Sequence, residues 1–475
     1  MTLLTELTNL SASELVRIIS SKRASPVEVA QAHLAGIEKL NPALNAIVTI
    51  APDFLEQARH AEESLMRGDI HGPLHGLPIT IKDTIETAGL RCTSGSRIRQ
   101  QYIPGQDAPS VARLRKAGAV IIGKTNAAEM AMDYTADNPV FGRTNNPQDL
   151  SRTPGGSSGG EAAAISTCMS AGGLGSDLAG SIRIPSHFCG ISGLKPTTGT
   201  IPGAGQFPPS IGPYSLGAVV GPLARRIEDL YLLLDVLRGK NTPRVGWIAD
   251  SLLNNTGSLR GHRVAWYSDD TVAPVTEETR KAVTDAASAL SDAGLSVEEH
   301  RPPGVERGHE LWLKLFSRAS VVQLRDVYSG REQEGGDFVR WRLATADDSP
   351  APTLDEYISS WMERDRLSEE LSGWMSDVPL LIAPVGATPA FKHDTLKLTV
   401  GGSKLSAFRA FSYSQTFNVF DLPSVTVPAG ISSEGLPIGV QIVGRRFEED
   451  TVLKAAAIVE AAIGGWQLPK IVMQS

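Results

Sequence analysis

The chain has 475 residues, of which 41% are hydrophobic and 20% are charged, a composition typical of a globular protein with a large core. Its formal net charge is -7 and no run of Lys and Arg stands out, which argues against nucleic acid as a partner. Three cysteines do not suit a disulfide framework, and neither a signal-peptide pattern nor the roughly 20 apolar residues of a membrane span is present, so we expect a cytoplasmic protein that contacts no membrane.

The first 70 residues predict helices. Ser11 with Glu14, and Ser25 with Glu28, form capping-box patterns ahead of apolar periodic runs. Strands and helices alternate after that, which predicts an α/β fold built on a sheet. Strands are expected over 77–82, 119–122, 379–384, 422–428 and 438–443, and helices over 109–117, from Asn126 with Glu129, over 354–371 and over 449–462.

Residues 138–222 have a different texture, because Gly, Ser, Thr and Pro dominate and long apolar periodicity is scarce. A compact domain rarely carries so long a structureless region unless that region is functional. We therefore place the active site here.

Three motifs match known patterns by letter and fail on context. Gly118–Thr125 matches the phosphate loop, but a helix precedes it and its apolar, β-branched residues predict a strand. Gly155–Gly159 matches the nucleophile elbow of α/β-hydrolases, but no apolar strand precedes it. Ser192–Lys195 matches the S-x-x-K pattern, but Gly193 and Pro196 argue against the helix that it needs.

Metal-binding and cysteine-based chemistry also lack support. His71 and His75 are four residues apart, yet the Gly and Pro between them exclude a shared helix face, so we expect no metal site. Cys189 lies close to His187 in sequence, but a buried, inert cysteine is the commoner case.

Two small-residue turns, 155–160 and 178–183, can bring several backbone N–H groups together, which is what a tetrahedral oxyanion requires. A serine in such a turn can attack a carbonyl if a base takes its proton. Lys82 is a candidate base, because burial at the end of an apolar strand should lower its pKa toward neutrality. The alternative is a strand-end lysine paired with Asp83, and the residues alone leave both interpretations open.

Several segments in a fixed order resemble the amidase signature family, namely Gly76–Asp83, Pro154–Gly160, Asp177–Pro185, Phe188–Gly190, Gly193–Pro196, Leu422–Gly430 and Gly435–Gly444. The resemblance is dense from about 25 to 200, returns over 417–446 and is thin from about 240 to 375. It implies one large domain over 1–475, with a central mixed β-sheet covered by helices on both faces. The signature core would span about 70–222, and a variable, substrate-covering helical region about 240–375.

The resemblance also implies the roles of individual residues. Ser181 would be the nucleophile, Ser157, carried on a cis peptide, would relay the proton, and Lys82 would be the neutral terminal base. The oxyanion hole would use the backbone N–H groups of Leu178, Ala179, Gly180 and Ser181, with Ser158, Asp177 and Arg183 supporting the turn. Many members have Gly where this chain has Ala179, which is acceptable only if φ is negative there. No metal or cofactor is implied.

The resemblance does not define a single substrate class. By resemblance, Met130, Ala131, Met132 and Tyr134 would line the acyl side of the pocket, and their apolar character favours an aryl or alkyl group in amides, anilides, esters or aryl carbamates (urethanes). Trp312, Phe316, Trp341 and Trp361 could form a lid or simply a core. The alternatives are a glutaminase-type subunit of a tRNA-dependent amidotransferase complex and a non-catalytic ligand-binding homologue. Homodimers are common among similar proteins.

Overall fold

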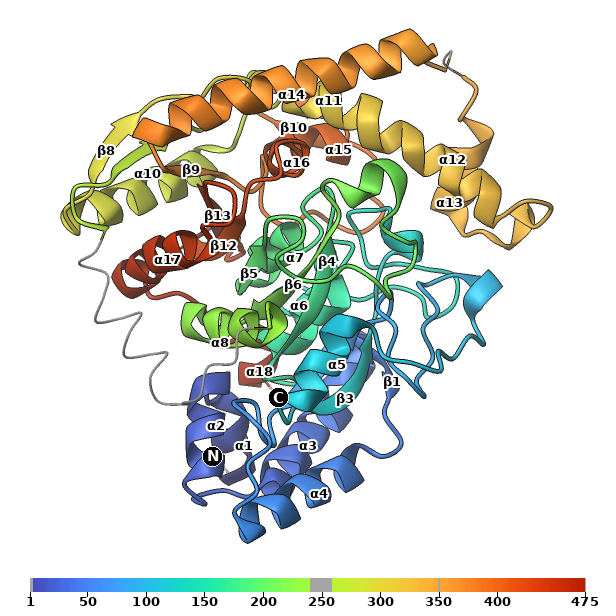
Figure 1. Ribbon diagram of the computed structural model, residues 1–475, viewed down its shortest axis with the longest axis vertical. Helices are drawn as coiled ribbons and strands as arrows, with labels where there is room; N and C mark the ends of the chain where they lie inside the picture. Colours follow the sequence, from blue (N-terminus) through green and yellow to red (C-terminus); the bar gives the residue numbers. More distant parts are fainter. Residues whose placement is uncertain (1–2, 240–258, 349–350, 475) are drawn as a thin grey trace.

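The computed structural model describes residues 3–239, 259–348 and 351–474 (Figure 1). Its main feature is an 11-stranded sheet in the order β1-β3-β2-β4-β6-β5-β12-β13-β9-β7-β8. The strands are β1 Ile47–Ile50, β2 Pro78–Lys82, β3 Val120–Thr125, β4 Gly172–Asp177, β5 Ser192–Lys195, β6 Val219–Ala224, β7 Arg263–Trp266, β8 Ser296–Glu299, β9 Leu380–Pro384, β12 Ser424–Ile431 and β13 Pro437–Gly444, with a separate hairpin of β10 Leu398–Val400 and β11 Ser403–Leu405.

The sheet is mixed, as expected. Strand β2 pairs in parallel with β3 and β4, and β7 with β8 and β9, whereas the central pairs from β4 to β9 are antiparallel. The helices are α1 Leu3–Asn9, α2 Ala12–Ser20, α3 Pro26–Leu44, α4 Phe54–Arg67, α5 Pro109–Lys116, α6 Gly159–Ser166, α7 Arg183–Cys189, α8 Ile227–Leu237, α10 Glu277–Asp292, α11 Gly308–Trp312, α12 Arg318–Val327, α13 Asp337–Ala344, α14 Leu354–Asp377, α15 Ala407–Ala410, α16 Ser412–Val419, α17 Glu449–Ile463 and α18 Lys470–Gln474.

Helices cover both faces of the sheet, and strand β12 shows how its side chains divide between them. Val425 and Val427 pack in one cluster with Val452 and Leu453 of α17, while Thr426 between them donates to the carbonyl oxygen of an α7 residue, Arg183. This alternation is what a strand buried on both faces requires. The prediction of one α/β domain with a mixed sheet between helices is therefore confirmed.

Local sequence signals placed many elements correctly. Both capping boxes form, so that Ser11 begins α2 and Ser25 begins α3. The motifs Gly118–Thr125 and Ser192–Lys195 also adopt the structures predicted for them. Helix α5 precedes Gly118 and strand β3 follows it, so no phosphate loop forms, and Ser192–Lys195 is strand β5 rather than a helix.

The helix predicted from Asn126 is wrong. Only a single 3-10 turn forms, over Glu129–Ala131, because Met130 and Ala131 have φ values of 54° and 57°, which cannot continue an α-helix. The Glu129 carboxylate accepts from the Tyr328 hydroxyl at 2.7 Å instead of capping a helix.

The expectation of a long structureless region over 138–222 is also wrong, because it contains β4, β5, β6, α6 and α7. The glycine-rich sequence of β4 hid the strand, since glycine is depleted in strands. Gly173 is needed there because a Cβ atom would lie 1.8 Å from the Glu161 carboxylate of α6, so the helix packs directly against the strand backbone.

Helices α11–α14 lie together along one side of the molecule, with α14 running across its top in Figure 1. They belong to the predicted variable region of about 240–375, of which residues 240–258 and 349–350 lie outside the described residues. Among the helices that the structure describes, none is long and apolar enough to cross a membrane.

Candidate active site

Lys82 is the last residue of β2 and is fully buried. Its Nζ atom donates to Ser157 Oγ at 2.6 Å and to Ser176 Oγ at 2.9 Å. Burial lowers the pKa of Lys82 from 10.5 to about 7, although the charges of Asp177 and Glu161 favour the ammonium form. A lysine with a pKa near neutrality can be a free amine at physiological pH, as a general base must be.

The alternative interpretation of Lys82, a pair with Asp83, does not describe the structure. The Asp83 carboxylate accepts from the Thr93 hydroxyl at 2.5 Å and from the Thr93 amide at 3.1 Å. Lys82 instead meets Ser176, which sequence analysis did not single out. Ser176 reaches Lys82 because β4 pairs with β2, and the only signal in the sequence was its place beside the Asp177–Pro185 motif.

A second buried titratable group, Glu161, lies behind Lys82 and was also missed. Its carboxylate accepts from the hydroxyl of Thr80 and, at 2.6 Å, from that of Thr125. Thr80 shares a face of β2 with Lys82, and Thr125 is the register partner of Lys82 on β3. Burial raises the pKa of Glu161 to about 7, so its charge changes in the same pH range as that of Lys82.

The three predicted serines lie around one small space. The Gly156–Ser157 peptide is cis, and Ser157 and Ser181 both border the same cavity. The Ser158 amide donates to the Ser181 carbonyl oxygen at 3.2 Å, and the Ser158 hydroxyl contacts the backbone of Ser176 at 3.4 Å. Ser158 therefore ties the turn before α6 to the turn before α7, while Ser157 and Ser181 are left facing the cavity.

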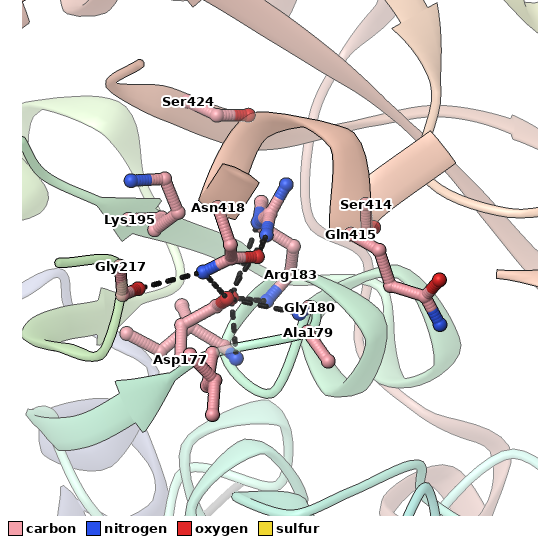
Figure 2. Close-up of polar contacts among 12 residues, drawn as sticks. Asp177, Ala179, Gly180, Arg183, Lys195, Gly217, Ser414, Gln415, Asn418 and Ser424 are labelled. Carbon is pink, nitrogen blue, oxygen red and sulfur yellow. Dashed lines mark hydrogen bonds and ion pairs between the residues drawn. The ribbon is translucent and has the colours of Figure 1, made fainter. Parts of the chain in front are cut away.

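Asp177 and Arg183 form a fully buried ion pair of 2.9 Å at the base of the second turn (Figure 2). Asp177 also accepts from the amides of Gly180 at 2.9 Å and Ile182 at 3.0 Å, and from the Asn418 side chain at 3.0 Å. Burial alone would raise the pKa of Asp177, but the Arg183 guanidinium and these amides hold it well below its usual range. The ionised carboxylate thus holds the backbone of the turn in place.

Leu178 and Ala179 border the cavity beside Ser181. Their amides have no hydrogen-bond acceptor among the residues that the structure describes, whereas the Gly180 amide is engaged by Asp177. Ala179 does not adopt a positive φ, so alanine suits this position as well as glycine would. The oxyanion-binding capacity predicted for this turn therefore rests on the amides of Leu178 and Ala179 more than on that of Gly180.

The two neighbouring small residues of the turn should respond differently to substitution. Gly180 has a φ of +104°, and a Cβ atom there would lie 2.7 Å from both Ile184 Cδ1 and Ser414 Cβ. We expect Gly180→Ala to lower the free energy of unfolding by about 1–3 kcal/mol, and Ala179→Gly to change it by less than about 1 kcal/mol. Urea denaturation of both variants checks this, and equal losses would contradict the conformations described.

The predicted substrate-binding residues Met130, Ala131, Met132 and Tyr134 all line the cavity. Residues of the predicted substrate-covering region (about 240–375, the covering region below) also line the cavity, among them Trp312, Phe316 and Phe338, and so does Phe408 of α15. The four aromatic residues that could have formed a lid or a core thus divide. Trp312 and Phe316 line the cavity, Trp361 packs edge-on against Phe316, and Trp341 is exposed.

The cavity wall also has a polar part that the sequence did not reveal. Arg342 of α13 borders the cavity, and its Nη2 atom donates to the carbonyl oxygen and hydroxyl of Ser317 at 2.8 and 2.7 Å. Gln206 and Gln323 also line the cavity. Across the described parts of the chain, no cluster of three or more His, Cys, Asp or Glu side chains could hold a metal ion.

The pairing of Cys189 with His187 does not form a reactive site. Burial raises the pKa of the Cys189 thiol well above its usual range and lowers that of His187 to about 4. The His187 ring contacts the Thr388 carbonyl oxygen and the Gly439 amide instead.

Comparisons with known proteins show the family to which the chain belongs. The family model for Amidase matches residues 28–453. A glutamyl-tRNA(Gln) amidotransferase subunit from Carboxydothermus hydrogenoformans is 34% identical, with 96% of this chain and 97% of that protein aligned. Fatty-acid amide hydrolase 2-A from Danio rerio is 32% identical, with 97% and 90% aligned. A bacterial aryl acylamidase structure matches with a TM-score of 0.86 at 25% identity, covering 98% of this chain and 99% of that one. The chain therefore belongs to the amidase signature family of hydrolases, which act on C–N bonds.

Proposed function

We propose that this protein hydrolyses amide-type bonds through an acyl-enzyme on Ser181, with Ser157 as proton relay and Lys82 as base. The observation that carries the proposal is the 2.6 Å contact between Lys82 Nζ and Ser157 Oγ beside a cavity that Ser181 also borders. A lysine with its pKa lowered to about 7 supports it, because an ammonium group could not take a proton.

The proton moves along these three side chains. As Ser181 Oγ attacks the substrate carbonyl, its proton passes to Ser157, whose own proton passes to the Lys82 amine. The C–N bond then breaks, and the leaving amine takes the proton back by the same route. Water hydrolyses the Ser181 ester with the same groups acting in reverse order. Ser176 holds the Lys82 amine in position throughout, at 2.9 Å.

The amides of Leu178 and Ala179 stabilise the negative oxygen that forms during attack. Donors fixed before the reaction are worth more than donors that must reorganise, and removing one commonly costs about 10²- to 10³-fold in kcat. Asp177 supplies that fixation, because it binds the Gly180 and Ile182 amides on either side of Ser181.

The substrate class that we propose is a hydrophobic amide or anilide, extending to esters and aryl carbamates. The support is the largely apolar wall around the cavity, to which Met130, Met132, Trp312 and Phe316 contribute. Apolar walls of this kind contribute to affinity through burial of aryl or alkyl surface.

Release of p-nitroaniline from a hydrophobic anilide by the purified protein tests the proposal. We expect turnover that a chelator such as EDTA leaves unchanged, because every group in the proposed mechanism belongs to a Ser or Lys side chain or to the backbone. Esters and aryl carbamates of the same acyl group then rank the substrates. Turnover confined to polar primary amides such as glutamine would contradict the proposed substrate class.

One observation favours a second candidate, a glutaminase-type subunit of a tRNA-dependent amidotransferase. The Arg342 guanidinium in the cavity wall could pair with the α-carboxylate of glutamine. That candidate predicts little activity without partner subunits, together with glutamine hydrolysis that Arg342→Met reduces and anilide hydrolysis that it spares. Ligand binding without any turnover would instead support a non-catalytic binding protein.

A further inference from the structure

The turn that precedes Ser181 is held on its carbonyl side as well as its amide side. The indole N–H of Trp312 donates to the Leu178 carbonyl oxygen at 3.0 Å, and the Tyr134 hydroxyl donates to the Ala179 carbonyl oxygen at 2.9 Å. Two consecutive peptide planes are thereby each fixed by one side chain that comes from outside the turn.

Fixing a carbonyl also fixes the next amide, because C=O and N–H point in opposite directions across a trans peptide. By holding the Leu178 carbonyl, Trp312 sets the direction of the Ala179 N–H, one of the proposed oxyanion donors. By holding the Ala179 carbonyl, Tyr134 sets the direction of the Gly180 N–H. That second amide meets the Asp177 carboxylate at 2.9 Å, so both ends of the plane are restrained.

The Tyr134 hydroxyl is itself restrained by a second hydrogen bond, which leaves its hydrogen one acceptor. It accepts from Gln415 Nε2 at 2.8 Å, and Gln415 Oε1 contacts His309 Nδ1 at 2.6 Å. With the nitrogen of Gln415 donating, the Tyr134 hydrogen is left for the Ala179 carbonyl. Burial raises the pKa of Tyr134 well above its usual range, so the hydroxyl stays a donor across the working pH range.

His309 and Trp312 lie three residues apart in α11, and so on one side of that helix. The helix is seated closely on α16, because a Cβ atom at Gly308 would lie 2.2 Å from Thr416 Oγ1. Helix α11 belongs to the covering region of the cavity, yet both contacts run from it to the turn before Ser181, one directly and one through Gln415 and Tyr134.

We propose that α11 restrains the turn before Ser181 and so acts as a clamp on the oxyanion donors. Trp312 and Tyr134 are the positioning residues, and they set the peptide planes of Leu178–Ala179 and Ala179–Gly180. The inference rests on the proposed function, since it concerns donors to the oxyanion of that reaction. It gives the covering region a part in the chemical step beyond forming the wall of the cavity.

Two variants remove the clamping hydrogens and keep an aromatic ring. For a hydrophobic anilide, Trp312→Phe is expected to lower kcat by about 10- to 100-fold, because it frees the peptide plane that carries the Ala179 donor used in the transition state. Tyr134→Phe frees the neighbouring plane, which Asp177 still holds at Gly180, so kcat is expected to fall by a smaller factor, about 3- to 10-fold. A trifluoromethyl ketone, which adds to a serine to form an oxyanion, should lose affinity by the same factor as kcat/KM. A non-reacting amide competitor should keep its affinity in Tyr134→Phe, which retains the ring, and in Trp312→Phe it should lose less affinity than the ketone does.

Matched controls remove the same groups elsewhere in the covering region. Trp374, which stacks on His300, and Tyr357, which packs on Trp361, do not border the cavity, so Trp374→Phe and Tyr357→Phe should keep wild-type kinetics. Thermal unfolding shows whether each variant is folded, and two independent clamp variants guard against failure of one.

The outcomes separate the clamp from the proposed function. Unchanged kcat in both folded clamp variants would overturn the clamp and leave the proposed function standing, and so would a loss of kcat without loss of ketone affinity. A wild-type protein that turns over no anilide, or whose turnover does not need Ser181, would overturn both.

Discussion

Replacing Ser181 by alanine is expected to lower kcat for a hydrophobic anilide by about 10⁴-fold or more, because the substitution removes the attacking oxygen itself. The fold should be preserved, since the Ser181 carbonyl still accepts from the Ser158 amide and the turn is held by Asp177. Steady-state kinetics at saturating substrate measure the loss, and thermal unfolding checks the fold.

Ser192 offers a matched control for that variant. It is a fully buried serine whose hydroxyl has no hydrogen-bond partner among the described residues, and it lies in the S-x-x-K pattern with Lys195. Ser192→Ala should leave kcat within about twofold of wild type, because an unpaired hydroxyl contributes no bond to lose. A large loss in Ser192→Ala together with normal activity in Ser181→Ala would show that Ser181 is not the nucleophile and would point to Ser192 of β5 instead.

The activity should depend on the protonation of Lys82, with an acidic limb near neutrality. Lys82 must be a free amine to take a proton, and burial lowers its pKa to about 7. Above that pH the amine is neutral and kcat/KM is at its plateau. Below it, protonation removes the base and kcat/KM falls about tenfold per pH unit. Lys82→Met should lose about 10²- to 10⁴-fold and show no such limb.

Glu161 tests the assignment of that limb. Its carboxylate favours the ammonium form of Lys82, so Glu161→Gln should lower the pKa of Lys82 and move the acidic limb to lower pH. Because the pKa of Glu161 itself is raised to about 7, the wild-type limb belongs to the coupled pair. A limb that moves to higher pH in Glu161→Gln, or persists in Lys82→Met, would contradict the role of Lys82.

Much of the fold could be predicted where local signals are strong. Capping residues such as Ser11 and Ser25 bond within their own first turn, so their effect needs no distant partner. Strand β4 could not be predicted, because its glycines lack strand propensity and Gly173 owes its place to the close approach of Glu161. The turn at Met130 likewise depends on Glu129 binding Tyr328 of the covering region, some two hundred residues away in sequence.

The candidate site divides in the same way. The order of its motifs predicted Lys82, Ser157 and Ser181, and the structure brings Lys82 into contact with Ser157 beside a cavity that Ser181 borders. The contacts of Ser176 and Trp312 were not predicted, because one depends on strand pairing and the other on the docking of α11. Arg342 comes from the region where the motifs are thin, and only its neighbour Trp341 was considered there, so the sequence did not indicate a charged residue in the cavity wall.

The most direct test of the proposed acyl-enzyme is to trap it. The protein is mixed with a p-nitrophenyl carbamate, whose carbamoyl-enzyme is expected to hydrolyse slowly, and the modified residue is located by peptide mass spectrometry. We predict one carbamoyl group on the peptide that contains Ser181, which forms with release of p-nitrophenol and is absent in Ser181→Ala. A carbamoyl group on Ser157 or Cys189 instead, or p-nitrophenol release that persists unchanged in Ser181→Ala, would contradict the proposed mechanism.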